Sequence, residues 1–372
     1  MHPIRLILGN ISPIDSKNHA SEEMLVRYMM TLAAALVLAA PVAGHHSDAG
    51  LDMESVVTFE GTVTEFSWRN PHIYFTVETT NGRGERVEWT LQTGSTITSL
   101  RKGWTRESLS IGDRVTVGAH PALDGRPYAL LNSIEKEGGI VIPMSFDRDT
   151  GEPRLAEPVA AASTNTVEGT WMAKSSELVR YPGGFDGFFK AHLRLTEKGA
   201  AAQASYDEFS DENPESRCIG RPPPAMIVSS NLFPLQIEIS ENEEIIMIRS
   251  QFWDEERTVY LDGRAHPAVS ERFASGHSIG WWNEDTLVVD TMNFTDHRSP
   301  YQTGVPSGAR KHVVEKYRLN EEGTRIVVEF VLEDPEYIAE PLAHTRELIY
   351  SPHLEISRYD CDPEAARRFL LQ

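Results

Sequence analysis

Cysteine is scarce in this chain, since only Cys218 and Cys361 occur among its 372 residues. So few cysteines exclude a disulfide-rich scaffold, and the sequence holds no Cys/His cluster with the spacing of a zinc site. In an exported chain an even number of cysteines favours a disulfide, which here would close a loop of more than 100 residues. Two free buried thiols are the alternative.

Positive charge is also scarce, because 35 Lys and Arg stand against 55 Asp and Glu, a formal net charge of -20. This balance argues against nucleic acid or an anionic membrane surface as a partner. Nucleophile motifs are missing as well: there is no Gly-x-Ser-x-Gly, no Cys beside a His and no phosphate-binding glycine loop. The sequence therefore predicts no organic cofactor.

Long apolar runs are missing, and the one strongly apolar segment, Met30–Gly44, is too short to span a bilayer comfortably. Arg27 precedes it and small residues close it, which is typical of a secretory signal peptide cleaved after Gly44. We therefore interpret residues 1–44 as a signal peptide whose translation starts at Met24 or Met29. The mature protein is expected in the periplasm or outside the cell, with no membrane span.

Strand patterns dominate the rest of the sequence and predict an all-β fold of two barrels. Residues 45–142 contain five alternating segments and a short helix, which predicts a small OB-like barrel. Residues 143–166 are rich in Pro, Ala, Glu, Ser and Thr and predict a linker. Residues 167–372 predict a larger antiparallel barrel of the calycin or lipocalin kind with a C-terminal helix.

The second domain has strand patterns at short intervals along its whole length. They cover residues 169–173, 192–195, 235–240, 245–251, 258–261, 311–319, 324–332 and 346–350, in addition to a hairpin at 276–297. Only residues 197–206 and 363–371 look helical. Asp362 would cap the last helix, with Pro363 at its first position.

The hairpin Gly276–His297 is the most informative segment because it carries polar residues between strands that look buried. Asp290 shares a strand face with Val288, Met292 and Phe294, so we expect its carboxylate to be buried. A buried carboxylate needs hydrogen-bond donors, and a His or Arg partner would supply them. A His held in one tautomer by a carboxylate is the arrangement that a general base requires.

The leading hypothesis is a hydrophobic small-molecule site in the mouth of the larger barrel. His277 would act as base or acid, Asp290 would orient it, and Arg264 or His312 would polarise the ligand. The residues predicted to line the site are Trp281, Trp253, Phe294, Asn293 and His266. Such a site suits isomerisation, elimination or cyclisation. A non-catalytic carrier using the same cavity is the second hypothesis.

A purely structural interpretation of the same residues stays open. Asp290 and Arg264 would form a buried pair that fixes strand register, while His277 satisfies a backbone carbonyl group. Trp281 and Trp282 point to opposite faces of their strand, so one ring is expected in the core and only the other can line a pocket. The sequence does not decide between these interpretations, nor does it give the oligomeric state.

A third hypothesis places a metal at the start of the mature chain. His45 and His46 would follow the cleavage site, and their nitrogens together with His72 suit copper or nickel. The alternative is a solvated His pair, with Asn70-Pro71-His72 shaping a turn.

Two resemblances support the division into domains. Residues 45–141 resemble the exported bacterial family DUF6152 through His45-His46-Ser47, Gly61-Thr62-Val63, Trp68-Arg69-Asn70-Pro71-His72 and Gly112-Asp113-Arg114-Val115. Residues 167–365 resemble a group of uncharacterised exported β-rich proteins through Leu195–Gly199, Tyr260–Pro267, Gly276–Gly280, Asp285–Thr291 and His312–Glu315. Both resemblances imply export, and neither implies a defined activity.

Overall fold

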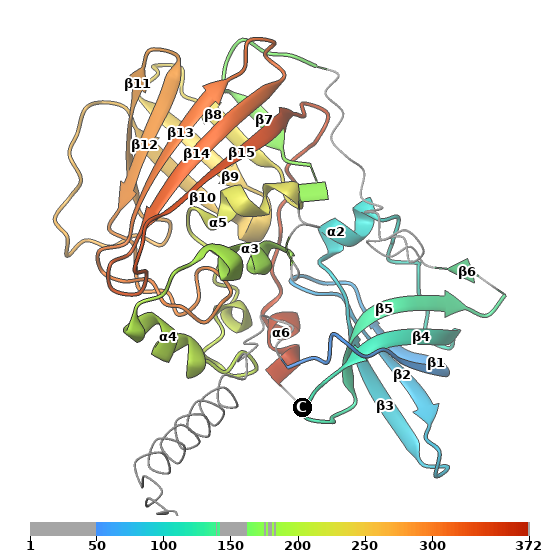
Figure 1. The fold of residues 1–372 in the computed structure, drawn as a ribbon. Coiled ribbons are helices and arrows are strands. Elements are labelled where there is room, and N and C mark those ends of the chain that lie inside the picture. Colours follow the sequence, from blue (N-terminus) through green and yellow to red (C-terminus); the bar gives the residue numbers. More distant parts are fainter. Residues whose placement is uncertain are drawn as a thin grey trace, which may run out of the picture. The chain divides into compact units, whose positions relative to one another are not determined.

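The computed structural model describes residues 50–138, 140–141, 162–174, 176–177, 181 and 184–370 of the chain (Figure 1). The predicted signal peptide, His45, His46 and most of the predicted linker lie outside these residues. Among the described helices, none is both long and apolar enough to cross a membrane.

The first domain is a small barrel. Its strands are β1 (Val57–Ser67), β2 (Tyr74–Thr80), β3 (Arg86–Gln92), β4 (Arg114–Pro121), β5 (Tyr128–Lys136) and β6 (Ile140–Val141), with helix α2 (Thr96–Arg101) between β3 and β4. They pair in the order β3-β2-β1-β4-β5-β6, and a parallel pairing of β3 with β5 closes the first five into a barrel. The predicted five-stranded barrel with one intervening helix is confirmed.

The second domain is a larger closed barrel. Its strands are β7 (Gly169–Met172), β8 (Leu235–Ile239), β9 (Ile245–Ser250), β10 (Glu256–Tyr260), β11 (His277–Asn283), β12 (Thr286–Met292), β13 (His312–Leu319), β14 (Arg325–Glu333) and β15 (Leu342–Tyr350). They close in the order β10-β11-β12-β13-β14-β15-β7-β8-β9. Neighbours are antiparallel except β10 and β11, which pair in parallel. The predicted second barrel is therefore also confirmed.

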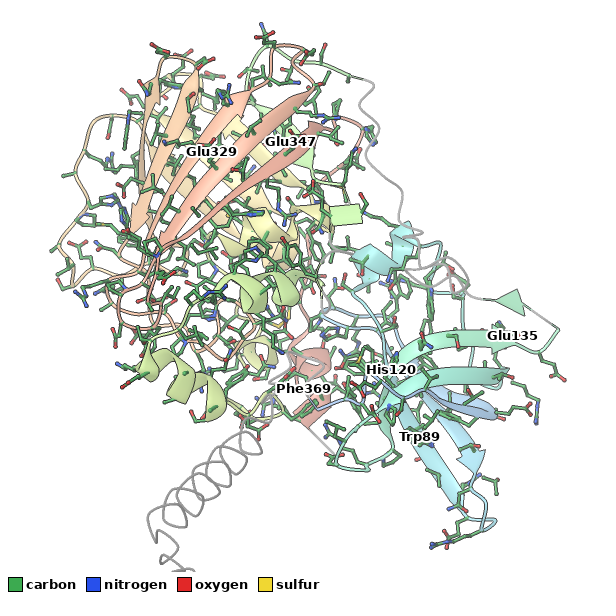
Figure 2. All side chains as sticks on the ribbon, in the orientation of Figure 1. Trp89, His120, Glu135, Glu329, Glu347 and Phe369 are labelled. Carbon is green, nitrogen blue, oxygen red and sulfur yellow. A yellow bond between two sulfur atoms is a disulfide. The ribbon has the colours of Figure 1, made fainter. Side chains whose placement is uncertain are left out.

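The alternation of apolar and charged residues determines which face of each strand turns inward. In β14, Ile326, Val328 and Phe330 are buried, whereas Glu329 between them is exposed. Figure 2 shows Glu329 and Glu347 on the outside of the barrel wall. Burial of such a continuous apolar face stabilises the sheet by about 25 cal/mol per Å².

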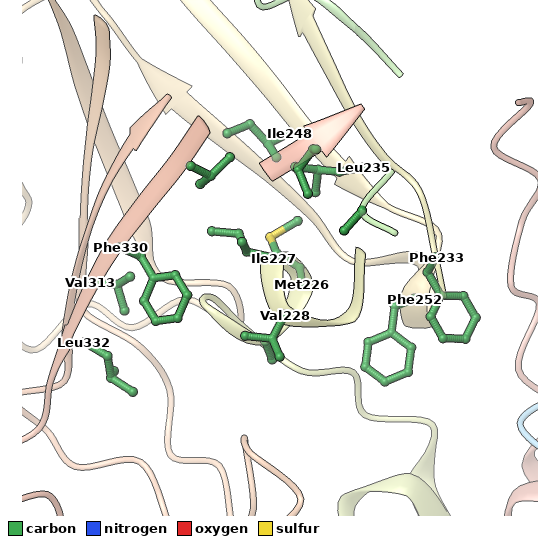
Figure 3. Packing of buried hydrophobic residues seen from close by; sticks show 14 of the residues in the cluster. Met226, Ile227, Val228, Phe233, Leu235, Ile248, Phe252, Val313, Phe330 and Leu332 are labelled. Carbon is green, nitrogen blue, oxygen red and sulfur yellow. The ribbon is translucent and has the colours of Figure 1, made fainter. Parts of the chain in front are cut away.

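Side chains occupy the interior of the large barrel, whose mouth the sequence predicts to hold a ligand site. Helix α5 (Ala225–Val228) is buried at all four positions. In Figure 3, its Met226 and Ile227 lie between Ile248 of β9 and Phe330 of β14. This region is therefore a packed core of the kind found in most small barrels.

Helices in the second domain are more numerous than predicted. They are α3 (Gly184–His192), α4 (Glu197–Ala204), α5 and α6 (Pro363–Ala366), with 3-10 helices η2 (Pro214–Arg217), η3 (Ser229–Asn231), η4 (Phe252–Asp254) and η5 (Arg368–Leu370). The predicted strand at 192–195 is wrong, because His192 ends α3 and Leu195 makes only an isolated bridge to Ile338. The predicted cap of the last helix is confirmed, since the Asp362 carboxylate accepts hydrogen bonds from two backbone N–H groups of α6.

Cys218 and Cys361 form the predicted disulfide, with their Cα atoms 5.9 Å apart. Cys361 also makes a β-bridge to Asn70 of the small barrel, and the Asp362 N–H donates to the Asn70 carbonyl at 2.9 Å. Further along, Phe369 packs in a cluster with Leu51, Tyr74 and Tyr128 of the small barrel. We call residues 357–370 the C-terminal strap, because they connect the disulfide to the first domain.

We expect the strap to depend on the disulfide for much of its stability. Replacing both Cys218 and Cys361 by Ser should lower the free energy of unfolding by about 2–5 kcal/mol, because the disulfide closes a long loop in the unfolded chain. Urea unfolding followed by circular dichroism would measure the loss. A reductant should destabilise the natural protein to the same extent and leave the double variant unchanged, and equal stability of both proteins would contradict the expectation.

Candidate functional site

His277 and Asp290 of the hairpin lie on the outer face of the large barrel. On β12 the inward positions are Leu287, Val289 and Thr291, all fully buried, so Asp290 points outward with 24% of its side chain exposed. The expectation that Asp290 is buried is therefore wrong. The physical reason is that both faces of β12 are apolar in sequence, and the alternation alone does not say which one turns inward.

Four of the predicted site residues form one chain of contacts on this outer face. The Asp290 Oδ1 atom lies 2.9 Å from His312 Nε2 and 3.2 Å from His266 Nε2. The other ring nitrogen of His266, Nδ1, lies 2.9 Å from His277 Nδ1. His277 reaches Asp290 only through His266. We call His277, His266, Asp290 and His312 the outer-face chain.

The two ends of the outer-face chain have pKa values that shift in opposite directions. The hydrogen bond to Asp290 raises the pKa of His312 despite partial burial. Burial, followed by the charge of His266, lowers the pKa of His277. Burial acts to raise the pKa of Asp290, but hydrogen bonds and charge from His312 and His266 outweigh it and lower that pKa. The outer-face chain therefore favours a protonated ring at His312 and a neutral ring at His277.

A loop after β10 brings His266 over the barrel wall. The Asn293 backbone is left-handed, with φ 60°. Its side-chain amide donates to the carbonyl groups of Pro267 and Ala268 at 3.1 and 3.4 Å. Arg264 pairs with Asp262 and stacks over the Tyr260 ring at 3.8 Å. The alternative in which Arg264 and Asp290 form a buried pair is therefore wrong.

The aromatic residues predicted for the site are spread over the molecule. Trp281 and Trp282 are 46% and 44% exposed, so the expectation that one of them is in the core is wrong. Both lie near the end of β11, where the last three residues of the strand are exposed. Phe294 is buried, and the Lys311 amine lies 4.3 Å from its ring centroid. Of the residues predicted to line the site, only Trp253 lines the cavity described below.

A polar cluster that sequence reasoning missed lies inside the large barrel. The buried guanidinium of Arg257 pairs with the buried Glu315 carboxylate and donates to Thr291 and Tyr317 at 3.1 Å each. Lys311 is fully buried as well, and burial lowers its pKa to about 7. Glu315 is buried on the inward face of β13, whereas His312 lies on the opposite face of the same strand.

A cavity of about 240 Å³ lies where the small barrel meets the second domain. Its lining residues are Pro71, His72, Gly94, Ser95, Thr98, Phe185, Glu215, Ser229, Leu232, Phe233, Phe252, Trp253, Gln302 and Tyr359. We call it the His72 cavity. It contains two residues that the sequence singled out, Trp253 as a ligand contact and His72 as a metal ligand.

The polar wall of the His72 cavity is built around the buried carboxylate of Glu215. Its Oε1 atom accepts hydrogen bonds from Arg221 and, at 2.6 Å, from Gln302. Its Oε2 atom lies 3.8 Å from His72 Nε2. Burial acts to raise the pKa of Glu215, but the charges of Arg221 and His72 outweigh it and keep that pKa below its usual value. Glu215 is therefore a permanent buried anion at neutral pH.

Several residues around the His72 cavity have backbone conformations that residues other than glycine rarely adopt. Trp253 and Gln302 have φ values of 60° and 56°, in the left-handed region. Asp254 follows at φ 53°, and its carboxylate accepts from the Tyr359 N–H at 2.6 Å. The buried Nε1 atom of Trp253 has no hydrogen-bond partner among the described residues. Left-handed bulky residues and unpaired buried donors cluster at binding sites more than elsewhere.

The structure offers no support for a metal site in the part of the chain it describes. Within those residues, no group of three or more His, Cys, Asp or Glu side chains has an arrangement that could hold a metal ion. His72 lies in the cavity beside Glu215, and its Nδ1 atom lies 3.3 Å from the Thr93 carbonyl oxygen. The predicted partners His45 and His46 are outside the described residues.

Comparison with known proteins finds a family match for the first domain. Residues 34–131 match the family described as a family of unknown function, DUF6152. This match supports the resemblance seen in the first domain. A search of curated proteins finds no match.

The outer-face chain predicts a specific pH dependence. With Asp290→Asn, the pKa of His312 should fall, because the hydrogen bond that raises it is lost while burial remains. A raised pKa stabilises the folded state below the ordinary value of 6.5 and ceases to do so as pH rises through the folded-state pKa. The variant should therefore lose about 0.5–1 kcal/mol more stability at pH 5.5 than at pH 8.5, a small value because the pair is partly exposed.

NMR titration of the His312 ring resonances would measure the pKa, and urea unfolding at the two pH values would measure the stability. The control is Asp285→Asn, in the turn of the same hairpin and away from the His rings. An unchanged His312 pKa in Asp290→Asn would contradict the assignment of the contact.

Proposed function

We propose that this protein binds a small and mostly apolar molecule in the His72 cavity. The proposal keeps the ligand class predicted from the sequence but moves the site from the mouth of the larger barrel to the cavity beside the small barrel. The observation that supports it most is the unpaired Trp253 Nε1 donor, which belongs to a lining residue held in a left-handed conformation.

The dimensions of the cavity limit the size of the ligand. An engineered apolar cavity of about 150 Å³ accepts benzene, so about 240 Å³ suits a single six-membered ring with a short substituent. The rings of Phe185, Phe233, Phe252, Trp253 and Tyr359 supply most of the apolar lining. A ligand that also carries a hydrogen-bond acceptor could pair with Trp253 Nε1.

Export to the periplasm or the cell exterior remains part of the proposal. The Cys218–Cys361 disulfide supports it, because structural disulfides persist mainly in oxidising compartments. The resemblance of the second domain to exported β-rich proteins and the possible metal site at His45 and His46 stay predictions.

A second candidate function is acid–base catalysis at the outer-face chain. The ordered contacts from His277 through His266 to Asp290 favour it, because a carboxylate that fixes a His tautomer is a common base arrangement. If it holds, turnover of a trial carbonyl or enol substrate should fall at least about 100-fold in His266→Ala. An equal fall in His353→Ala, whose side chain is exposed elsewhere, would contradict a specific role.

The cavity proposal predicts that filling the cavity abolishes binding. Thr98→Leu should weaken binding of benzyl alcohol at least about 10-fold from an expected Kd of about 0.1 mM, because the larger side chain occupies the space of the ring. Thr345→Leu, the same substitution on an exposed position of β15, is the matched control. Isothermal titration calorimetry would give the Kd, and circular dichroism would show that both variants are folded.

Native mass spectrometry of the natural protein would show any retained ligand directly. Equal affinity of the two Leu variants for benzyl alcohol would place the binding site outside the His72 cavity and overturn the proposal.

A further inference from the structure

We propose that His266 is a positioning residue that makes His277 Nε2 the proton acceptor of the outer-face chain, and that it withdraws this role when it takes up a second proton. This inference rests on the second candidate function, because it names the atom that acts as the base there and the proton that controls it. Two observations carry it, namely the order of the hydrogen bonds and the aromatic rings that hold His277.

The direction of the hydrogen bonds is set at Asp290. Burial acts to raise the pKa of Asp290, but hydrogen bonds and charge from His312 and His266 outweigh it, so the carboxylate is ionised at neutral pH. An ionised carboxylate can only accept hydrogen bonds. Its Oδ1 atom lies 2.9 Å from His312 Nε2 and 3.2 Å from His266 Nε2, so both of these ring nitrogens carry a hydrogen.

The contact between the two imidazole rings has room for a single hydrogen. His266 Nδ1 and His277 Nδ1 lie 2.9 Å apart, and a hydrogen bond between them needs one donor and one acceptor. A neutral His266 already carries its hydrogen on Nε2, so its Nδ1 is bare and accepts. His277 must then donate from Nδ1, and its neutral ring keeps the lone pair on Nε2. Through His266, the Asp290 carboxylate therefore determines which nitrogen of His277 can act as a base.

A second proton on His266 reverses this order. It binds at Nδ1, which then becomes a donor toward His277 Nδ1. Burial, followed by the charge of His266, lowers the pKa of His277, which favours a neutral His277 ring beside a protonated His266. That neutral ring must accept at Nδ1 and therefore carries its hydrogen on Nε2. The same Nε2 atom is a proton acceptor while His266 is neutral and a donor once His266 is protonated.

Aromatic rings hold the plane of the His277 imidazole. The Tyr260 ring stacks on it, with the two centroids 5.3 Å apart and an angle of 22° between the planes, and the Phe273 ring lies 5.5 Å away. Held in this way, the ring keeps Nδ1 directed at His266, so a change of tautomer rather than a rotation of the ring follows the proton on His266. Among the described residues, no partner lies within hydrogen-bond distance of His277 Nε2. This nitrogen is therefore the one that stays available to a substrate.

Other charged groups around His277 influence the pH at which this switch acts. After burial and the charge of His266, the charge of Arg264 also lowers the pKa of His277, whereas that of Glu271 raises it. The titratable and charged groups that face His277 or its hydrogen-bonded partners are Tyr260 of β10, Asp262, Arg264, His266 and Glu271 of the following loop, Asp290 of β12, His312 of β13 and Glu333 of β14. Within the described part of the chain, only His266 is hydrogen-bonded to the His277 ring, so the tautomer of His277 follows His266.

The experiment is an NMR titration of the natural full-length protein, labelled with the nitrogen-15 isotope at histidine. Two-bond hydrogen–nitrogen correlation spectra separate a bare ring nitrogen from one that carries a hydrogen. At pH 8 we expect His277 to have a bare Nε2 and a protonated Nδ1. As the pH falls, Nε2 should gain a hydrogen while Nδ1 loses one, with the same midpoint as the titration of His266. Simple protonation of His277 would instead add a hydrogen at Nε2 and leave the one on Nδ1 in place.

His266→Asn separates the positioning role from packing. Its amide oxygen can accept from His277 Nδ1 but cannot take up a proton, so Nε2 should stay bare until His277 itself is protonated. His266→Ala removes the acceptor and should give a mixture of both His277 tautomers. The matched control is His353→Asn, at an exposed position, which should leave the His277 titration unchanged.

Exchange of the α-hydrogens of cyclohexanone in heavy water, followed by proton NMR, tests the base itself. His277 Nε2 would take a proton from the carbon beside the carbonyl group, and a deuteron from the solvent would return to that carbon. The rate should fall at least about 100-fold in His277→Ala. A hydrogen on His277 Nε2 at pH 8, or protonation of His277 without loss of the Nδ1 hydrogen, would overturn the inference. The expected tautomers without exchange above the level of His277→Ala would overturn the second candidate function alone.

Discussion

A buried carboxylate is stable only when hydrogen-bond donors or positive charges surround it. Glu215, which is buried between the small barrel and the second domain, has this requirement. Arg221 and Gln302 come from two separate loops of the second domain, and His72 comes from the small barrel. These three residues must converge on one side chain for the carboxylate to remain ionised. The cost of burying this one charge therefore constrains how the two barrels meet and which residues line the cavity between them.

The strands could be predicted from the sequence because the alternation of apolar and polar residues depends only on neighbouring positions along the chain. The hairpin from His277 to Met292 and the continuous apolar face of β14 are examples in which neighbouring residues determine the element. Asp290 shows the limit of this reasoning. Its strand is apolar on both faces because the loop that carries His266 covers the outer one, and alternation does not distinguish a covered outer face from an interior.

The candidate sites were predictable to different degrees. His266, His277, Asp290 and His312 could be picked out because they are polar residues in apolar surroundings, although the order of their contacts could not. The His72 cavity was not predictable as a unit, because its walls come from residues far apart in sequence, such as His72, Glu215 and Tyr359. The left-handed backbone at Trp253 also has no signal in the sequence, since Gly or Asn would be usual there.

The C-terminal strap has a consequence for the order in which the two barrels can fold. Asn70 of the small barrel donates to the Tyr359 carbonyl, a residue 289 positions later, and Phe369 completes a cluster around Leu51 and Tyr74. The small barrel can therefore make its last contacts only when the whole chain is present on the side of the membrane where it folds. Until then the apolar side chains of Leu51, Tyr74 and Tyr128 lack the cover of Phe369, so the small barrel is complete only as part of the whole protein.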